Sequence, residues 1–297
     1  MSTLARRRRA RRLRPISIAA ATWLILAGMA AILAPVLAPQ GPTVAEPARA
    51  LLAPGAGGLL GTDFLGREIW VRLVWGARLT LAVGATALAL AVAVGLPLGL
   101  AAGSLSGWSD AILMRLVDGL LAFPGLLLAM AVMAVLGAGM ESVAIAAGLT
   151  AAPAYARVAR SAAHEARIQP YIDSARAVGC SPWRIAVRHI LPNAGPALVS
   201  YAGAQMGSIL LMIGALNFLG LGAAPGTPEW GMMLADGRAY LRQAPWASVF
   251  PGLALTLTVL AANLLGDAWT QEEPFKLKWG KSDTRDKRTA PRRGALN

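Results

Sequence analysis

Cysteine and histidine are almost absent from this sequence, which holds one cysteine, Cys180, and two histidines, His164 and His189. A single cysteine excludes an internal disulfide, and three such scattered residues have none of the spacings of a zinc site. We therefore expect Cys180 to be a structural thiol, and we predict no metal site in this chain.

Motifs for bond chemistry or nucleotide binding are also missing. The sequence has no Gly-x-Ser-x-Gly elbow and no HExxH pair. Its one Gly-Lys-Ser, at residues 280–282, is not a Walker A motif, because Phe275 stands where that motif needs its first glycine. These absences predict a non-catalytic chain without a cofactor of its own.

Charge is scarce, since only 14% of the residues are charged and 56% are hydrophobic. A helix of about 20 apolar residues crosses a hydrocarbon core of about 30 Å. We therefore predict an all-α integral membrane protein with six spans, of which the fourth must extend past Glu141 or Arg157. The runs without charge are residues 15–45, 79–109, 119–140, 142–156, 190–228 and 243–266.

Lysine and arginine are unevenly distributed around these runs. Twenty-one lie before the first span, between the fourth and fifth spans, or after the sixth, whereas six lie in the other connections. Because positive charge favours the cytoplasmic side, we predict that both termini are cytoplasmic. The arginine-rich residues 6–14 suit anionic lipid better than nucleic acid. Residues 15–45 are too long for a signal-peptide core, so we expect a retained anchor.

These patterns divide the chain into segments. We expect a basic cytoplasmic tail, a first span, an external loop and a core of five spans that includes a cytoplasmic loop, followed by a basic polar cytoplasmic tail. The corresponding residues are 1–15, 16–38, 39–78, 79–267 (with the loop at 157–192) and 268–297.

The loop at 157–192 is the least membrane-like internal part of the chain. Pro170 favours a helix start and Gly179 a helix end in the positive-φ conformation. Ser181 before Pro182 signals a second start, and Pro192 should break that helix before the fifth span. The first helix is shorter than the roughly 12 residues that an isolated helix needs. We therefore expect a docking element that a partner supports.

The same loop resembles the cytoplasmic signature of permease subunits in bacterial binding-protein-dependent ABC importers. That signature reads Glu-Ala-Ala, three residues, Gly, nine residues, Ile, one residue, Leu-Pro. Its spacing is intact here, with Asp and Ser in the first two positions and His189 in place of Ile. The resemblance is to the dipeptide, oligopeptide and nickel branch, DppC/OppC-like. It assigns coupling to an ATPase subunit to Asp173, Ser174, Ala175, Arg176, Gly179, Cys180, Leu191 and Pro192.

Two motifs on the predicted external side are similar to elements of the same branch. Residues 61–68 match Gly-Thr-Asp-x-x-Gly-Arg-Asp, with Glu68 in the last position, and residues 217–246 resemble the loop before the last span. The resemblance ends at Asp267, so the tail that follows carries no assigned role. The external elements that it marks are Gly61, Thr62, Asp63, Gly66, Arg67, Trp230 and Gly231.

The resemblance implies a six-helix type I ABC importer permease bundle with a cytoplasmic coupling helix, in a bacterial inner membrane. It implies a second homologous permease, an extracytoplasmic solute-binding protein, and two ATP-binding subunits or one fused pair. Those subunits, and not this chain, would bind ATP and Mg²⁺. Peptides are the expected cargo, and nickel ranks below them because the spans lack convergent His or carboxylate ligands.

Two charges inside the third span, Arg115 and Asp118, leave an alternative open. Charges within spans mark transport pathways, although the three-residue spacing also allows a local ion pair. An ion-coupled secondary transporter would use such charges and is the alternative from another class. A membrane enzyme ranks third, for want of a convergent nucleophile or metal set.

Overall fold

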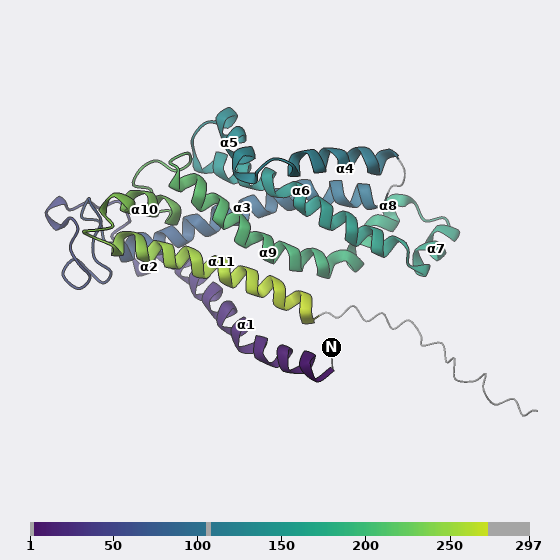
Figure 1. Ribbon diagram of the computed structural model, residues 1–297, viewed down its shortest axis with the longest axis horizontal. Coiled ribbons are helices and arrows are strands. Elements are labelled where there is room, and N and C mark those ends of the chain that lie inside the picture. The colour runs from purple at the N-terminus through teal and green to yellow at the C-terminus, as the bar shows by residue number, and fades with distance from the viewer. Residues whose placement is uncertain (1–2, 105–107, 273–297) are drawn as a thin grey trace, which may run out of the picture.

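The structure, a computed structural model, describes residues 3–104 and 108–272, so most of the predicted tail at 268–297 lies outside the described residues. The described residues hold no strand, only one isolated antiparallel bridge between Thr62 and Glu68. Most of the remaining described chain is helical, and long loops connect some of the helices (Figure 1). The helices are α1 (Thr3–Ile32), α2 (Ala34–Leu37), α3 (Ile69–Ser104), α4 (Trp108–Leu121), α5 (Gly125–Leu136), α6 (Met140–Arg167), α7 (Pro170–Ala177), α8 (Pro182–Ile185), α9 (Leu191–Phe218), α10 (Trp230–Gly237) and α11 (Trp246–Glu272).

Five helical stretches in the described part of the chain are long and apolar enough to cross a membrane. A sixth span results if α4 and α5 are counted as one broken span, which agrees with the six predicted spans. The second span begins at Ile69, within the predicted external loop 39–78. The five continuous stretches are Pro15–Ile32, Ile69–Ser104, Met140–Arg167, Pro182–Phe218 and Trp246–Ala268.

The fourth span extends past both Glu141 and Arg157, as predicted, and the irregular span is the third. The fourth is the continuous helix α6, whereas the third bends by 92° between α4 and α5. The break coincides with Pro124-Gly125, where Pro124 caps α5 in an extended conformation (φ −55°, ψ 125°). Proline cannot donate the backbone hydrogen bond that would continue α4, and it restricts the residue before it. The prediction of six spans did not anticipate this break in the third span.

Helices α3 and α6 pack against each other through glycine. Gly95, Gly99 and Gly103 follow one another at intervals of four and so lie along one side of α3. A Cβ atom at Gly99 would lie 2.3 Å from the carbonyl oxygen of Ala156. The backbones of the two helices therefore approach as closely as small residues permit, in the way that membrane helices associate.

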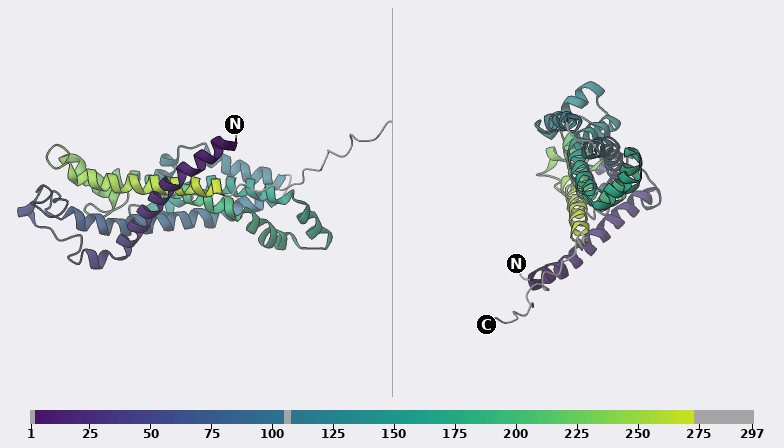
Figure 2. Two further views of the ribbon diagram at one scale, coloured as in Figure 1. Left: turned by 90° about the horizontal axis from the view of Figure 1, so that it is seen from below. Right: turned by 90° about the vertical axis from the view of Figure 1, so that its right-hand side faces the viewer.

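The two ends of the bundle differ. Figure 1 shows α7 and α8 at one end, and the long loops with α2 and α10 at the other. The first residues of α1 and the last described turns of α11 point toward the α7 end. Figure 2 shows α1 crossing the bundle at an angle. It contacts α11 through Trp23, whose Nε1 donates to Thr258 Oγ1 at 3.0 Å.

Candidate functional site

Helix α7 has clear start and stop signals. Pro170 occupies its first turn, where a missing N–H costs nothing. At its end, Gly179 has φ +79°, which confirms the predicted positive φ. The amide of Gly179 donates to the carbonyl of Arg176, and the amide of Cys180 donates to the carbonyl of Ala175, both at 3.0 Å. This pair of hydrogen bonds is a Schellman motif.

The support of α7 comes from its own chain. Ile172 and Ala175 face inward and are buried with Ala163 and Ala166 of α6. Leu100 of α3 also packs against this cluster, as does Cys180, which is partly buried. Ala175 therefore does not offer the close approach to a partner that its small size suggested. The support that so short a helix requires therefore comes from tertiary packing against α6.

The outward face of α7 is polar with an apolar edge. Asp173 and Ser174 are exposed, and Val178 is 79% exposed. Arg176 Nη1 lies 3.1 Å from Asp173 Oδ1, so these two charges pair with each other in the free chain. This face is available for docking at one end of the bundle.

The second helix of the loop does not end at Pro192. Ser181 caps α8, accepting a hydrogen bond on Oγ from the amide of Arg184 at 3.3 Å. A π-helical turn at Ala186–Ile190 then joins α8 to α9, and the amide of Leu191 donates to the carbonyl of Ala186. Pro192 has no backbone N–H to donate, and the wider π-helical turn lets the helix continue past it. Pro192 is exposed and Leu191 is partly buried.

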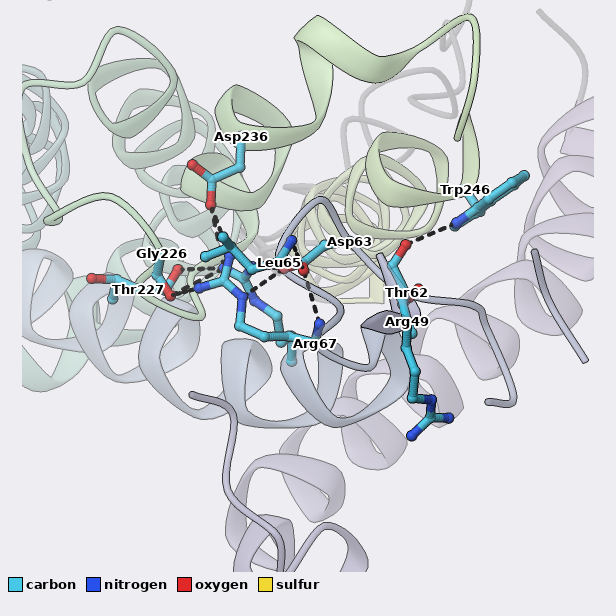
Figure 3. Close-up of polar contacts among 10 residues, drawn as sticks. Arg49, Thr62, Asp63, Leu65, Arg67, Gly226, Thr227, Asp236 and Trp246 are labelled. Carbon is cyan, nitrogen blue, oxygen red and sulfur yellow. Dashed lines mark hydrogen bonds and ion pairs between the residues drawn. The ribbon is translucent and has the colours of Figure 1, made fainter. Parts of the chain in front are cut away.

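At the opposite end, Asp63 organises a buried charged cluster that also contains Arg67, Arg72 and Asp236 (Figure 3). Asp63 Oδ1 accepts from the amides of Leu65 and Arg67 at 2.9 and 3.0 Å. Its Oδ2 accepts from Arg67 Nε at 2.7 Å and from Arg72 Nη1. Charge-assisted bonds of this kind are strong where water is excluded. We call these four residues the Asp63 cluster.

The Asp63 cluster ties together segments that lie far apart in the sequence. Arg67 Nη1 and Arg72 Nη2 both donate to the carbonyl of Gly226 at 3.2 Å. Arg72 Nη2 also lies 3.4 Å from Asp236 Oδ2 on α10. The loop before α3 is thus fixed to the α9–α10 connection and to α10 itself.

The two loop glycines are required by geometry. Gly66 has φ +75°, and a Cβ there would lie 1.9 Å from the carbonyl oxygen of Glu46. Gly61 has φ +80° and lies against Trp246, whose Nε1 donates to the carbonyl of Thr62 at 3.1 Å. Thr62 is fully buried and accepts from the amide of Leu52 at 2.9 Å. These external family elements are therefore structural in the free chain.

Beside the cluster, Glu229 is a fully buried carboxyl. It caps α10 by accepting from the amide of Met232, and it accepts from Thr80 Oγ1, both at 2.9 Å. Burial raises the pKa of Glu229, and the hydrogen bonds offset only part of that effect. Trp230 is buried against α3 and donates from Nε1 to the carbonyl of Leu73 at 3.0 Å, while Gly231 packs directly on Gly214.

Sequence reasoning assigned no role to Arg72, Asp236, Glu229 or Thr80. Two of them carried a signal, because Arg72 is a charge in the first turn of a long apolar helix and Glu229 lies in the stretch 217–246 that resembles a family element. The others become partners through contacts across some 150 residues or more, which no local pattern encodes.

Comparison with known proteins identifies the family. Residues 95–271 match the model of the family described as binding-protein-dependent transport system inner membrane component. The chain belongs to this family. This permease is therefore a membrane-embedded component of a transport system.

Two similar proteins are named for the solutes that their transport systems carry. The permease is 43% identical over 225 residues to the glutathione transport system permease protein GsiD of Pectobacterium atrosepticum, covering 76% of this chain and 75% of that protein. It is 40% identical over 248 residues to the dipeptide transport system permease protein DppC of Alkalihalophilus pseudofirmus, covering 84% and 82%.

A solved structure shows the same fold. An inward-facing form of the MetNI methionine ABC transporter matches with a TM-score of 0.55 at 19% identity, covering 67% of this permease and 94% of that chain. The permease therefore has the fold of a type I ABC importer subunit, as the sequence indicated.

Proposed function

We propose that this permease forms half of the translocation pathway of an ATP-driven peptide importer and that α7 couples it to an ATPase subunit. The observation that carries the proposal is the geometry of α7. Ile172 and Ala175 anchor the helix to the bundle, while Asp173, Ser174 and Val178 face outward. A short helix fixed on one side and open on the other can transmit force from a docked partner.

The coupling would pass through α6 and α9, the helices on either side of the loop. Two ATP-binding subunits, or one fused pair, would bind ATP and Mg²⁺ and close on α7. A movement of α7 would be carried by Ile172 and Ala175 to Ala163 and Ala166 on α6, because these residues pack together. A second homologous permease would complete the pathway, and a solute-binding protein would deliver the cargo to the opposite end.

Peptides are the proposed cargo. The relatives named for their substrates transport glutathione, a tripeptide, and dipeptides. Nickel, the other cargo of the branch, has no such support from these relatives. In the proposed orientation, α7 and both termini are cytoplasmic, and the Asp63 cluster lies on the external side.

The experiment compares two matched substitutions. Val178→Asp places a charge on the exposed edge of α7, and Val44→Asp places one on an exposed residue, 52% accessible, in the loops of the opposite end. We expect Val178→Asp to reduce copurification of the ATPase subunits and uptake of a labelled dipeptide, because an apolar docking contact would gain an unpaired charge. Val44→Asp should leave ATPase association unchanged.

Two results would contradict the proposal. One is normal ATPase association and uptake in Val178→Asp. The other is solute movement driven by an ion gradient in vesicles that contain this chain alone, which would favour a secondary transporter.

A further inference from the structure

Helix α4 has two different outward faces. Ile112, Leu116 and Leu120 form an exposed apolar face, since residues three and four apart lie together on a helix. By the same spacing, Arg115, Asp118 and Ala122 form a second exposed strip. The apolar face suits lipid, whereas the charged strip requires a different environment.

Asp118 forms an ion pair with α6 and not with Arg115. Arg157 Nη2 lies 2.5 Å from Asp118 Oδ1, and the two side chains are 57% and 58% exposed. The local pair allowed by the sequence is therefore not formed. Exposed charges within a membrane bundle are costly against lipid and typically face water or protein. This pair lies near the level of Gly99, because a Cβ at Gly99 would touch Ala156 and Arg160 of α6.

Arg115 adds a positive charge to this strip. None of the residues that the structure describes forms a hydrogen bond or ion pair with it. Asp118 neutralises one of the two arginines, so the group formed by Arg115, Asp118 and Arg157 has a net charge of +1. A guanidinium binds carboxylates through paired N–H donors.

The break between α4 and α5, next to this strip, also indicates an environment other than lipid. Ala122, Phe123 and Pro124, between α4 and α5, are all exposed in the single chain. Non-helical backbone at membrane depth is tolerated only where protein covers it or where it lines a water-filled cavity. The strip and the break therefore face away from lipid.

We propose that Arg115, Asp118 and Arg157 line the water-filled solute pathway and that Arg115, the arginine that Asp118 does not neutralise, receives the carboxylate of the passing solute. This inference rests on the proposed importer function. A carboxylate is the anionic group that every free peptide carries. An anionic lipid headgroup has related chemistry, but its acyl chains would contact the exposed non-helical backbone at residues 122–124.

The first test measures access from water. Ala122→Cys and Leu120→Cys lie at the same depth on the two faces and leave the ion pair intact. In the assembled complex in lipid nanodiscs, an anionic methanethiosulfonate should modify Ala122→Cys about tenfold or more faster than Leu120→Cys, because charged reagents are excluded from hydrocarbon. Peptide mass spectrometry separates these sites from native Cys180. Equal rates, or protection of Ala122→Cys, would overturn the proposal.

The second test measures the charge preference of the strip. At Asp118→Cys, the ratio of anionic to cationic reagent rates, each normalised to its rate with free thiol, should fall about three- to tenfold when Arg115→Gln is added. A unit charge about 6 Å away has this effect on oppositely charged probes in water at moderate salt. An unchanged ratio would contradict the assigned role of Arg115.

The lipid and the importer function are tested separately. If the ratio at Asp118→Cys collapses only in nanodiscs with anionic lipid, the strip is a headgroup site and the pathway assignment fails. If the complex transports a dipeptide but Ala122→Cys is protected, this inference fails and the importer function stands. If no complex with ATPase subunits forms, both fail together.

Discussion

At the scale of single residues, the end of the bundle that lies away from α7 depends on side chains that are charged or polar and yet buried. Asp63 accepts hydrogen bonds from two amides and two guanidinium groups at once. Buried ions of this kind contribute through their fixed geometry more than through net energy, since their desolvation offsets much of the attraction. Removing one partner leaves the other charge uncompensated, which is the larger effect.

Glu229 should make the stability of the permease depend on pH. Its folded-state pKa is raised by burial. The folded state therefore holds the proton more tightly than the unfolded state, and stability falls as pH rises from the unfolded value toward the raised one. Glu229→Gln keeps an acceptor for Thr80 or Met232 without a group that ionises. We expect the melting temperature of the variant to rise relative to that of the wild type as the pH increases above the unfolded-state pKa of the carboxyl.

The control for this pH effect is Glu46→Gln, an exposed carboxylate 52% accessible in its side chain. Its removal loses only an exposed ion pair with Arg49, so the melting temperature should stay close to that of the wild type. A constant offset between Glu229→Gln and the wild type across the pH range would show that Glu229 does not titrate on unfolding.

At the scale of elements, the interface of α3 and α6 depends on glycine, which allows a direct prediction. Gly99→Ala places a Cβ 2.3 Å from a carbonyl oxygen of α6, whereas at Gly119 on α4 nothing lies within 4 Å. We expect Gly99→Ala to lower the melting temperature and the yield of folded protein, at a cost of about 1–3 kcal/mol. Gly119→Ala should be neutral or slightly stabilising, because alanine is the better helix former. Thermal unfolding in detergent would compare them, and equal melting temperatures would refute the close approach.

Proline shows how far the sequence predicts these elements. The charge-free runs predicted the helices, because a bilayer requires about 20 apolar residues per span. Pro124 breaks the third span, whereas Pro192 does not break the fifth. Both positions carry a proline that favours a helix break, and the Pro124-Gly125 dipeptide is the stronger turn signal of the two. The outcome depended on whether neighbouring backbone could rearrange, as the π-helical turn at Ala186–Ile190 does.

The candidate sites were predictable to different degrees. The limits of α7 and the φ of Gly179 followed from local residues, because capping is a local property. The burial of Ala175 did not, since it depends on Ala163 and Ala166 of another helix. The partner of Asp118 was missed for the same reason, because Arg157 lies 39 residues away.

At the scale of the whole molecule, the proposed orientation can be tested through the only cysteine. Cys180 lies in the α7 loop and is partly exposed, so it reports the side on which α7 lies. We expect an impermeant maleimide to leave Cys180 unlabelled in intact cells and to label it after permeabilisation. Val44→Cys, at the opposite end, should show the reverse order. Strong labelling of Cys180 in intact cells would invert the orientation and exclude α7 as the site of a cytoplasmic ATPase.

The π-helical turn has a mechanical consequence. Because α8 and α9 join without a break, Pro182–Phe218 is one rod of 37 residues, about 55 Å long at 1.5 Å per residue. It begins beside α7 and ends at Asn217, whose Oδ1 fixes the amide of Ala223 in the loop that leads to the Asp63 cluster. A tilt of about 5° at one end displaces the other by about 5 Å, on the scale of known helix shifts. If α7 docks an ATPase subunit as proposed, a small tilt of this continuous stretch would displace the opposite end of the bundle.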